Sequence, residues 1–237
     1  MSYRSLTAAS SLVAVLFILP ACGGAPPPPP PPPDTVAEEE PPPPPPKPKK
    51  CESLDEDCKA KASTKAKVKS GALVFKPTEG WVYAQAEEHT LAQSSPDGAA
   101  LIIGTYATEK DAKKDAANRD AAFDTLLKSI GVTAPKQKVA WKKPQMPKEI
   151  AGLKLGLWEL GEVERGESKK KGPLLVVQGN LPEGRALIAV GFAPADQADS
   201  AEKIMASIDT LAPDENAEKA DKGGDEKAPD KAGSGSK

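Results

Sequence analysis

Aromatic residues are confined to one part of this 237-residue chain, and this confinement limits where a packed core can form. Eight of the ten Phe, Trp and Tyr residues lie within residues 71–192, and the other two precede residue 18. Residues 22–74 and 193–237 contain none. We therefore predict one globular domain in residues 68–213. A length of about 145 residues is ample for a single core that buries about two thirds of the unfolded surface.

The first residues are typical of a secretory signal peptide. A basic residue, Arg4, precedes an apolar run over Leu12–Leu19. This run is too short to cross a bilayer, because a spanning helix needs about 20 residues. It ends in the Leu-Pro-Ala-Cys sequence of Leu19–Cys22, which resembles a bacterial lipobox, although Pro20 departs from the small or hydroxylated residue more usual there.

The resemblance implies that residues 1–21 are removed as a lipoprotein signal peptide. It also implies that the thiol of Cys22 is acylated, with palmitate among the chains, and holds the protein to a membrane of the bacterial envelope. Gly23 follows the cysteine in place of an Asp. Under the common sorting rule this favours the outer membrane, facing the periplasm, over the inner membrane.

Residues 22–67 predict a spacer followed by a Lys-rich leader. Eight prolines run over Pro26–Pro33 and six over Pro41–Pro46. In polyproline II geometry the spacer, residues 23–50, reaches at most about 85 Å and packs no core. Lys59–Lys69 predicts a short exposed helix or a basic arm. Residues 214–237 are almost all small or charged, which predicts a disordered tail.

Cys51 and Cys58 form an even pair once Cys22 is assigned to lipid, and an oxidising compartment favours a bond between them. A continuous helix over seven residues would separate their Cα atoms by about 10 Å, whereas a disulfide tolerates less than about 7 Å. Either the pair is bonded in a loop, or the segment is helical and both thiols are free. We expect the bond, outside the core, so that its reduction changes the melting temperature little.

Alternating apolar residues and turn signals predict an α+β domain with a mainly antiparallel sheet and helices packed on it. One predicted helix follows Thr108 as its N-cap and stops at Gly131, and a second covers Ala195–Thr210. The stretch Ala186–Phe192 is apolar at every position, which is typical of a central strand covered on both faces. The other predicted strands are Ala72–Phe75, Trp81–Ala86, Thr90–Ser94, Ala100–Tyr106, Lys138–Lys142, Leu153–Glu162 and Leu174–Gln178.

The Phe75-Lys76-Pro77 sequence followed by Gly80-Trp81, with the order of elements over Ala72–Leu211, resembles the PsbP/DcrB-like superfamily. The resemblance implies an α/β/α sandwich around a mainly antiparallel sheet. Members of that superfamily serve unrelated functions, so the resemblance implies no activity.

No motif in the chain predicts catalysis, and we expect neither a cofactor nor a metal. The single histidine, His89, stands beside acidic residues, which is more typical of an exposed loop than of a ligand. The formal net charge of −2 with interspersed signs gives no reason to expect a nucleic-acid partner. We predict a non-catalytic module that docks to an envelope protein or a cell-wall component. The alternative is a periplasmic hydrolase whose site is built from scattered carboxylates.

A docking surface is predicted between the strands ending near Lys142 and beginning at Leu153. Two prolines indicate an exposed loop of preset shape, and a stiff loop loses little entropy on binding. The alternative is that its apolar residues fold back onto the domain edge. The candidate partner-binding residues, apolar side chains and lysines at this loop, are Trp141, Lys143, Met146, Lys148 and Ile150.

Overall fold

A computed structural model of the chain describes residues 50–215. The predicted signal peptide, Cys22, the proline runs and residues 216–237 lie outside the described residues. The helices are α1 (Ala112–Ser129) and α2 (Ser200–Ile208), with two short 3-10 helices, η1 (Glu56–Cys58) and η2 (Lys69–Gly71). The strands are β1 (Ala66–Val68), β2 (Leu73–Phe75), β3 (Val82–Gln85), β4 (His89–Gln93), β5 (Ala100–Ala107), β6 (Met146–Ile150), β7 (Leu153–Arg165), β8 (Lys170–Leu181), β9 (Arg185–Phe192) and β10 (Ala212–Pro213).

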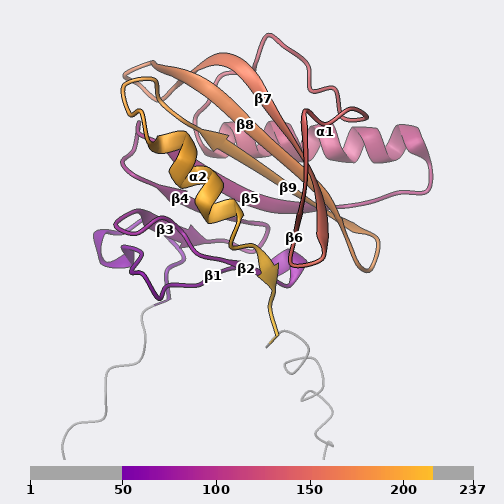
Figure 1. The fold of residues 1–237 in the computed structure, drawn as a ribbon, viewed down its shortest axis with the longest axis horizontal. Helices are drawn as coiled ribbons and strands as arrows, with labels where there is room; N and C mark the ends of the chain where they lie inside the picture. Colours follow the sequence, from indigo (N-terminus) through magenta and orange to yellow (C-terminus); the bar gives the residue numbers. More distant parts are fainter. Residues whose placement is uncertain (1–49, 216–237) are drawn as a thin grey trace, which may run out of the picture. The chain divides into compact units, whose positions relative to one another are not determined.

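Seven strands form one antiparallel sheet in the order β3-β4-β5-β9-β8-β7-β6, and β1-β2-β10 form a smaller one. The large sheet lies between α1 on one face and α2 with the small sheet on the other (Figure 1). The predicted α+β class, with helices packed on an antiparallel sheet, is confirmed.

Alternation along the central strands divides the apolar side chains between the two faces. In β9, Leu187 and Ala189 pack toward α2, whereas Ile188 and Val190 pack toward α1. All four are fully buried. A strand covered on both faces has no solvent side, which explains why this stretch is apolar throughout.

The helices begin later than predicted. Asp111, not Thr108, caps α1, because its Oδ1 accepts hydrogen bonds from the backbone N–H groups of Lys113 (2.9 Å) and Lys114 (3.0 Å). The backbone N–H of Thr108 instead donates to the carbonyl of Gly184, which ties the end of β5 to the β8–β9 turn.

The segment from residue 138 to residue 150 differs from the prediction. Lys138–Lys142 is a loop and turn, not a strand, and the predicted loop contains strand β6. Ala151 and Gly152, with φ of 48° and 80°, form a tight turn that pairs β6 with β7. Pro147 is accommodated because β6 is an edge strand, where a missing N–H breaks no ladder bond.

The Lys-rich leader is part of the fold, so the folded region extends N-terminally of residue 68. Ala66 and Val68 are buried in β1, which pairs with β2, and Cys58 is 2% exposed. The other end also extends further than expected, because the N–H of Asp214 donates to the carbonyl of Ala72. These contacts are long-range, so neither was predictable from local composition.

Both edges of the large sheet are protected from pairing with another chain. At β3 the segment after Cys51 lies along the edge. The N–H of Gln85 donates to the carbonyl of Cys51 (2.7 Å), and the N–H of Ala60 donates to the carbonyl of Trp81 (2.8 Å). At β6 the two-residue turn makes Ile150 a hydrogen-bonded partner of β7. Because hydrogen-bonded and non-hydrogen-bonded residues alternate along an antiparallel strand, the backbone nitrogen of Pro147 faces the open edge, and it carries no hydrogen to donate there.

Candidate binding site beside Trp141

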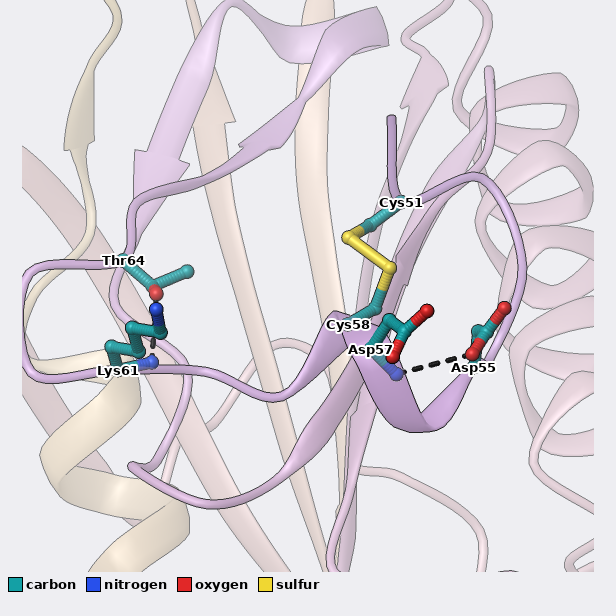
Figure 2. Close-up of a disulfide and its surroundings, with 6 residues drawn as sticks. All are labelled: Cys51, Asp55, Asp57, Cys58, Lys61 and Thr64. Atoms are coloured by element: carbon teal, nitrogen blue, oxygen red, sulfur yellow. Dashed lines mark hydrogen bonds between the residues drawn. A yellow bond between two sulfur atoms is a disulfide. The ribbon is translucent and has the colours of Figure 1, made fainter. Parts of the chain in front are cut away.

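The structure joins Cys51 and Cys58 in a disulfide with a Cα–Cα distance of 5.7 Å. The loop between them contains only the 3-10 turn η1, which corresponds to the bonded alternative. Asp55 begins that turn, its Oδ1 accepting from the N–H of Asp57 (Figure 2). The expectation that this loop lies outside the core was wrong, because the loop packs on the edge of β3.

The five predicted partner-binding residues do not share one loop. Ile150 is buried in the core, as the fold-back alternative required, and Lys148 Nζ pairs with Asp209 Oδ1 at 2.5 Å. Met146 is 45% exposed at the start of β6. Trp141 and Lys143 lie apart from these three, in a turn over α1.

The turn Ala140–Lys143 is held by Trp158 of β7. The indole Nε1–H of Trp158 donates to the carbonyls of both Ala140 (3.1 Å) and Lys143 (3.0 Å), and the turn is closed by the N–H of Lys143 donating to Ala140. Just beyond it, the Gln145 side chain accepts from the N–H of Glu159 (2.8 Å). The turn is thus fixed from the sheet beneath it.

Trp141 is the centre of an aromatic cluster. Its ring meets Phe123 of α1 edge to face at 5.7 Å and Trp158 at 5.4 Å. The guanidinium of Arg119 lies over the ring, 4.7 Å from its centroid, in a cation–π contact. Arg119 also donates to Asp120 Oδ1 from Nε and Nη2. Sequence reasoning missed Arg119, because it lies 22 positions before Trp141 in the chain.

The segment between α1 and β6 runs back along the helix (Figure 1). Two hollows on this side of the domain are both lined by Trp141. The first has a volume of about 560 Å³ and the second about 300 Å³. The first, which we call the lysine hollow, is lined by Ala112, Asp115, Ala116, Arg119, Ala140, Trp141, Lys142 and Lys143. The second, which we call the aspartate hollow, is lined by Asp120, Phe123, Asp124, Ala134, Pro135, Gln137, Lys138, Val139 and Trp141.

The two hollows carry opposite charge. In the lysine hollow, Lys142 and Lys143 are exposed and form no ion pair with any of residues 50–215. Its one carboxylate, Asp115, accepts a hydrogen bond from the N–H of Glu109 (3.2 Å). The aspartate hollow has two carboxylates, Asp120 and Asp124, and one lysine. The charge around Trp141 therefore changes sign from one side of the ring to the other.

A larger groove of about 620 Å³ lies where η2, the β8–β9 turn and the end of β10 meet. Leu73, Leu153 and Leu181 contribute apolar surface, and Arg185 donates from Nη1 to the carbonyl of Ser70. Glu215, the last described residue, also lines it.

The structure places His89, which the sequence analysis considered as a possible ligand, in a hollow that does not include Trp141. His89 lines a hollow of only about 80 Å³ between β4 and α1. Ser168 lies in the β7–β8 turn, where its N–H donates to Asp97 Oδ2 at 3.2 Å. Within residues 50–215, no three His, Cys, Asp or Glu side chains group as a metal site requires.

No family model matches the chain, and neither does any curated protein sequence. In the described part of the chain, no helix combines the length and apolar character needed to cross a membrane.

Proposed function

We propose that this chain is a lipid-anchored binding module of the bacterial envelope, without catalytic activity, that docks a partner at the two hollows beside Trp141. The observation that carries the proposal is the rigid display of unpaired charge around a half-buried Trp. Lys142 and Lys143 project from a turn fixed by Trp158, and Arg119 stacks on the Trp141 ring. Trp and Arg are enriched among the residues that dominate binding energies at interfaces.

The lipid anchor in this proposal rests on the resemblance of Leu19–Cys22 to a lipobox. The superfamily to which the domain is compared rests on the PsbP/DcrB-like resemblance. The α/β/α layering agrees with what that superfamily implies, and a spacer of proline runs suits a domain held away from a membrane. Cys22→Ser should leave a soluble or unprocessed chain. If that variant fractionates with outer membranes as the parent does, the anchor is not at Cys22.

Docking is tested by immobilising the full chain and measuring which components of its own solubilised envelope it retains, by quantitative mass spectrometry. Lys142→Glu with Lys143→Glu should remove the retained component, because both lysines line the lysine hollow. The matched control is Lys61→Glu with Lys65→Glu, which changes the net charge equally at two exposed lysines elsewhere. Equal retention by both variants would refute docking at Trp141. Met146→Ser with Lys148→Glu tests the remaining predicted partner-binding residues separately.

A further inference from the structure

We infer that the lysine hollow receives an acidic segment of a partner protein, one that places a carboxylate and an adjacent apolar side chain together. This inference rests on the proposed function and names the chemistry of its partner. Three of the lining residues, Ala112, Ala116 and Ala140, are small and apolar, so they leave room for one apolar side chain against the Trp141 ring. A volume of about 560 Å³ lies within the usual range for binding pockets.

Charge complementarity sets the polarity of the occupant. The charge of Arg119 is shared with Asp120, whereas Lys142 and Lys143 have no carboxylate partner within residues 50–215. An incoming carboxylate would therefore pair with these two lysines without displacing an existing ion pair. Both lie at the rim, where such pairs raise the association rate and specificity more than the affinity.

The aspartate hollow distinguishes a peptide from a polyanion. A polymer that carries a negative charge on every unit and crosses Trp141 would bring anions next to Asp120 and Asp124. A peptide can change charge within a few residues, so its acidic part can lie in the lysine hollow while a neutral or basic part lies in the aspartate hollow. The change of charge across Trp141 thus favours a protein segment over an anionic polymer or an anionic lipid surface.

Arg119 also argues against a sugar ring as the occupant. Sugars bind Trp by stacking on an open ring face, and the Arg119 guanidinium already covers one face of Trp141 at 4.7 Å. The two neighbouring rings meet Trp141 at 88° and 71°, which further restricts access to it. An apolar side chain in the lysine hollow can instead pack against the small residues Ala112, Ala116 and Ala140.

The test is photo-crosslinking of the full chain in living cells of its own organism. A photoreactive amino acid replaces Ala140, which lines the hollow and leaves both lysines in place. The same amino acid in place of Glu202, exposed on α2, is the control. Mass spectrometry then identifies the crosslinked material. We expect a protein segment with an excess of Asp and Glu over Lys and Arg and an apolar residue within about five positions of the crosslink.

A charge swap makes the test specific. Lys142→Glu with Lys143→Glu should lower the crosslink yield at position 140 by about tenfold or more, and replacing the partner's acidic residues by Lys should restore it. A crosslink to a neutral or basic segment, to a glycan or to lipid would overturn the acidic-segment inference while leaving docking at Trp141 in place. A yield at position 140 no higher than at position 202 would overturn both.

Discussion

The Arg165 side chain at the end of β7 donates a hydrogen bond from Nε to the carbonyl of Ile130, at the C-terminus of α1, over 2.7 Å. The same guanidinium donates from Nη1 to the Gly98 carbonyl and from Nη2 to Gln93 Oε1 (2.6 Å). Arg165 is 2% exposed. Burial lowers its pKa to about 10, an effect partly opposed by the charge of Asp97, so it stays charged at neutral pH. One buried cation thus joins the helix end, the β4–β5 turn and β4.

Arg165→Met should destabilise the domain by about 3–5 kcal/mol, because a similar volume is kept while three buried acceptors lose their donor. The stability of Arg165→Lys should lie between that of Arg165→Met and that of the parent, since a lysine keeps the charge but lacks the planar guanidinium with its several donors. Urea unfolding measures both. A loss below about 1 kcal/mol for Arg165→Met would show that water replaces the lost bonds.

Stability at acid pH should depend on Asp97. Hydrogen bonds from the Ser168 side chain and backbone, together with the nearby Arg165 charge, lower the pKa of Asp97. A carboxyl whose folded-state pKa is depressed stabilises the fold above its unfolded-state pKa of about 3.9, and this contribution is lost as pH falls through the folded value. Asp97→Asn should therefore lower the urea midpoint at pH 7, with a difference from the parent that narrows between pH 5 and pH 2. A difference that stays constant over this range would refute the linkage.

Removing the disulfide should weaken the covered edge of the sheet. Cys51→Ser with Cys58→Ser should cost about 2.5 kcal/mol from the entropy of an eight-residue loop, which lowers the melting temperature by about 5–10 °C. This prediction is larger than the small change in melting temperature expected from the sequence, because Cys58 is buried and the Cys51 carbonyl bonds to β3. Amide exchange should rise first in Val82–Gln85. Protection unchanged in β3 would mean that the segment stays in place without the bond.

The turn that presents Lys142 and Lys143 should depend on the Trp158 indole. Trp158→Phe removes the donor that serves two carbonyls of this turn and leaves a small cavity, at a cost of about 1–3 kcal/mol. Amide protection should fall over residues 139–145 more than in the sheet. Trp141→Phe, which keeps the Trp158 bonds, is the control for the loss of an indole alone.

Pro147 should keep the β6 edge from pairing with a second molecule. Pro147→Val restores a backbone N–H on the open edge and adds a strand-favouring side chain. We expect association that increases with protein concentration, measured by light scattering after gel filtration. Pro182→Val, at an exposed turn position, should stay as monomeric as the parent. A monomeric Pro147→Val variant would show that other features protect this edge.

Local patterns predicted the main elements of the fold because they depend only on neighbouring residues. The alternation in Leu153–Glu162 and the all-apolar run of Ala186–Phe192 identified β7 and β9, and a helical stripe with Gly131 after it identified α1. The same patterns predicted an antiparallel sheet, because turn-length connections cannot join parallel strands.

Short strands at the edges had no such pattern. β1 and β10 span three and two residues, and both pair with β2, to which β10 returns from more than 130 residues away. Proline in Met146–Ile150 indicated a loop, yet an edge strand tolerates it. At these places long-range partners determine the backbone conformation, and a local window does not contain them.

The candidate site divides in the same way. Its lysines and Trp141 stand together in the sequence, and Trp141 and Lys143 were among the five residues predicted to bind a partner, whereas the other three, Met146, Lys148 and Ile150, lie apart from the turn. Arg119, Phe123 and Trp158 come from α1 and β7, and only the packing of both against the turn brings them to Trp141. The sequence thus determined which charges the turn carries. The tertiary structure determined which of them remain unpaired, because ion pairing depends on distances between segments that are far apart in the chain.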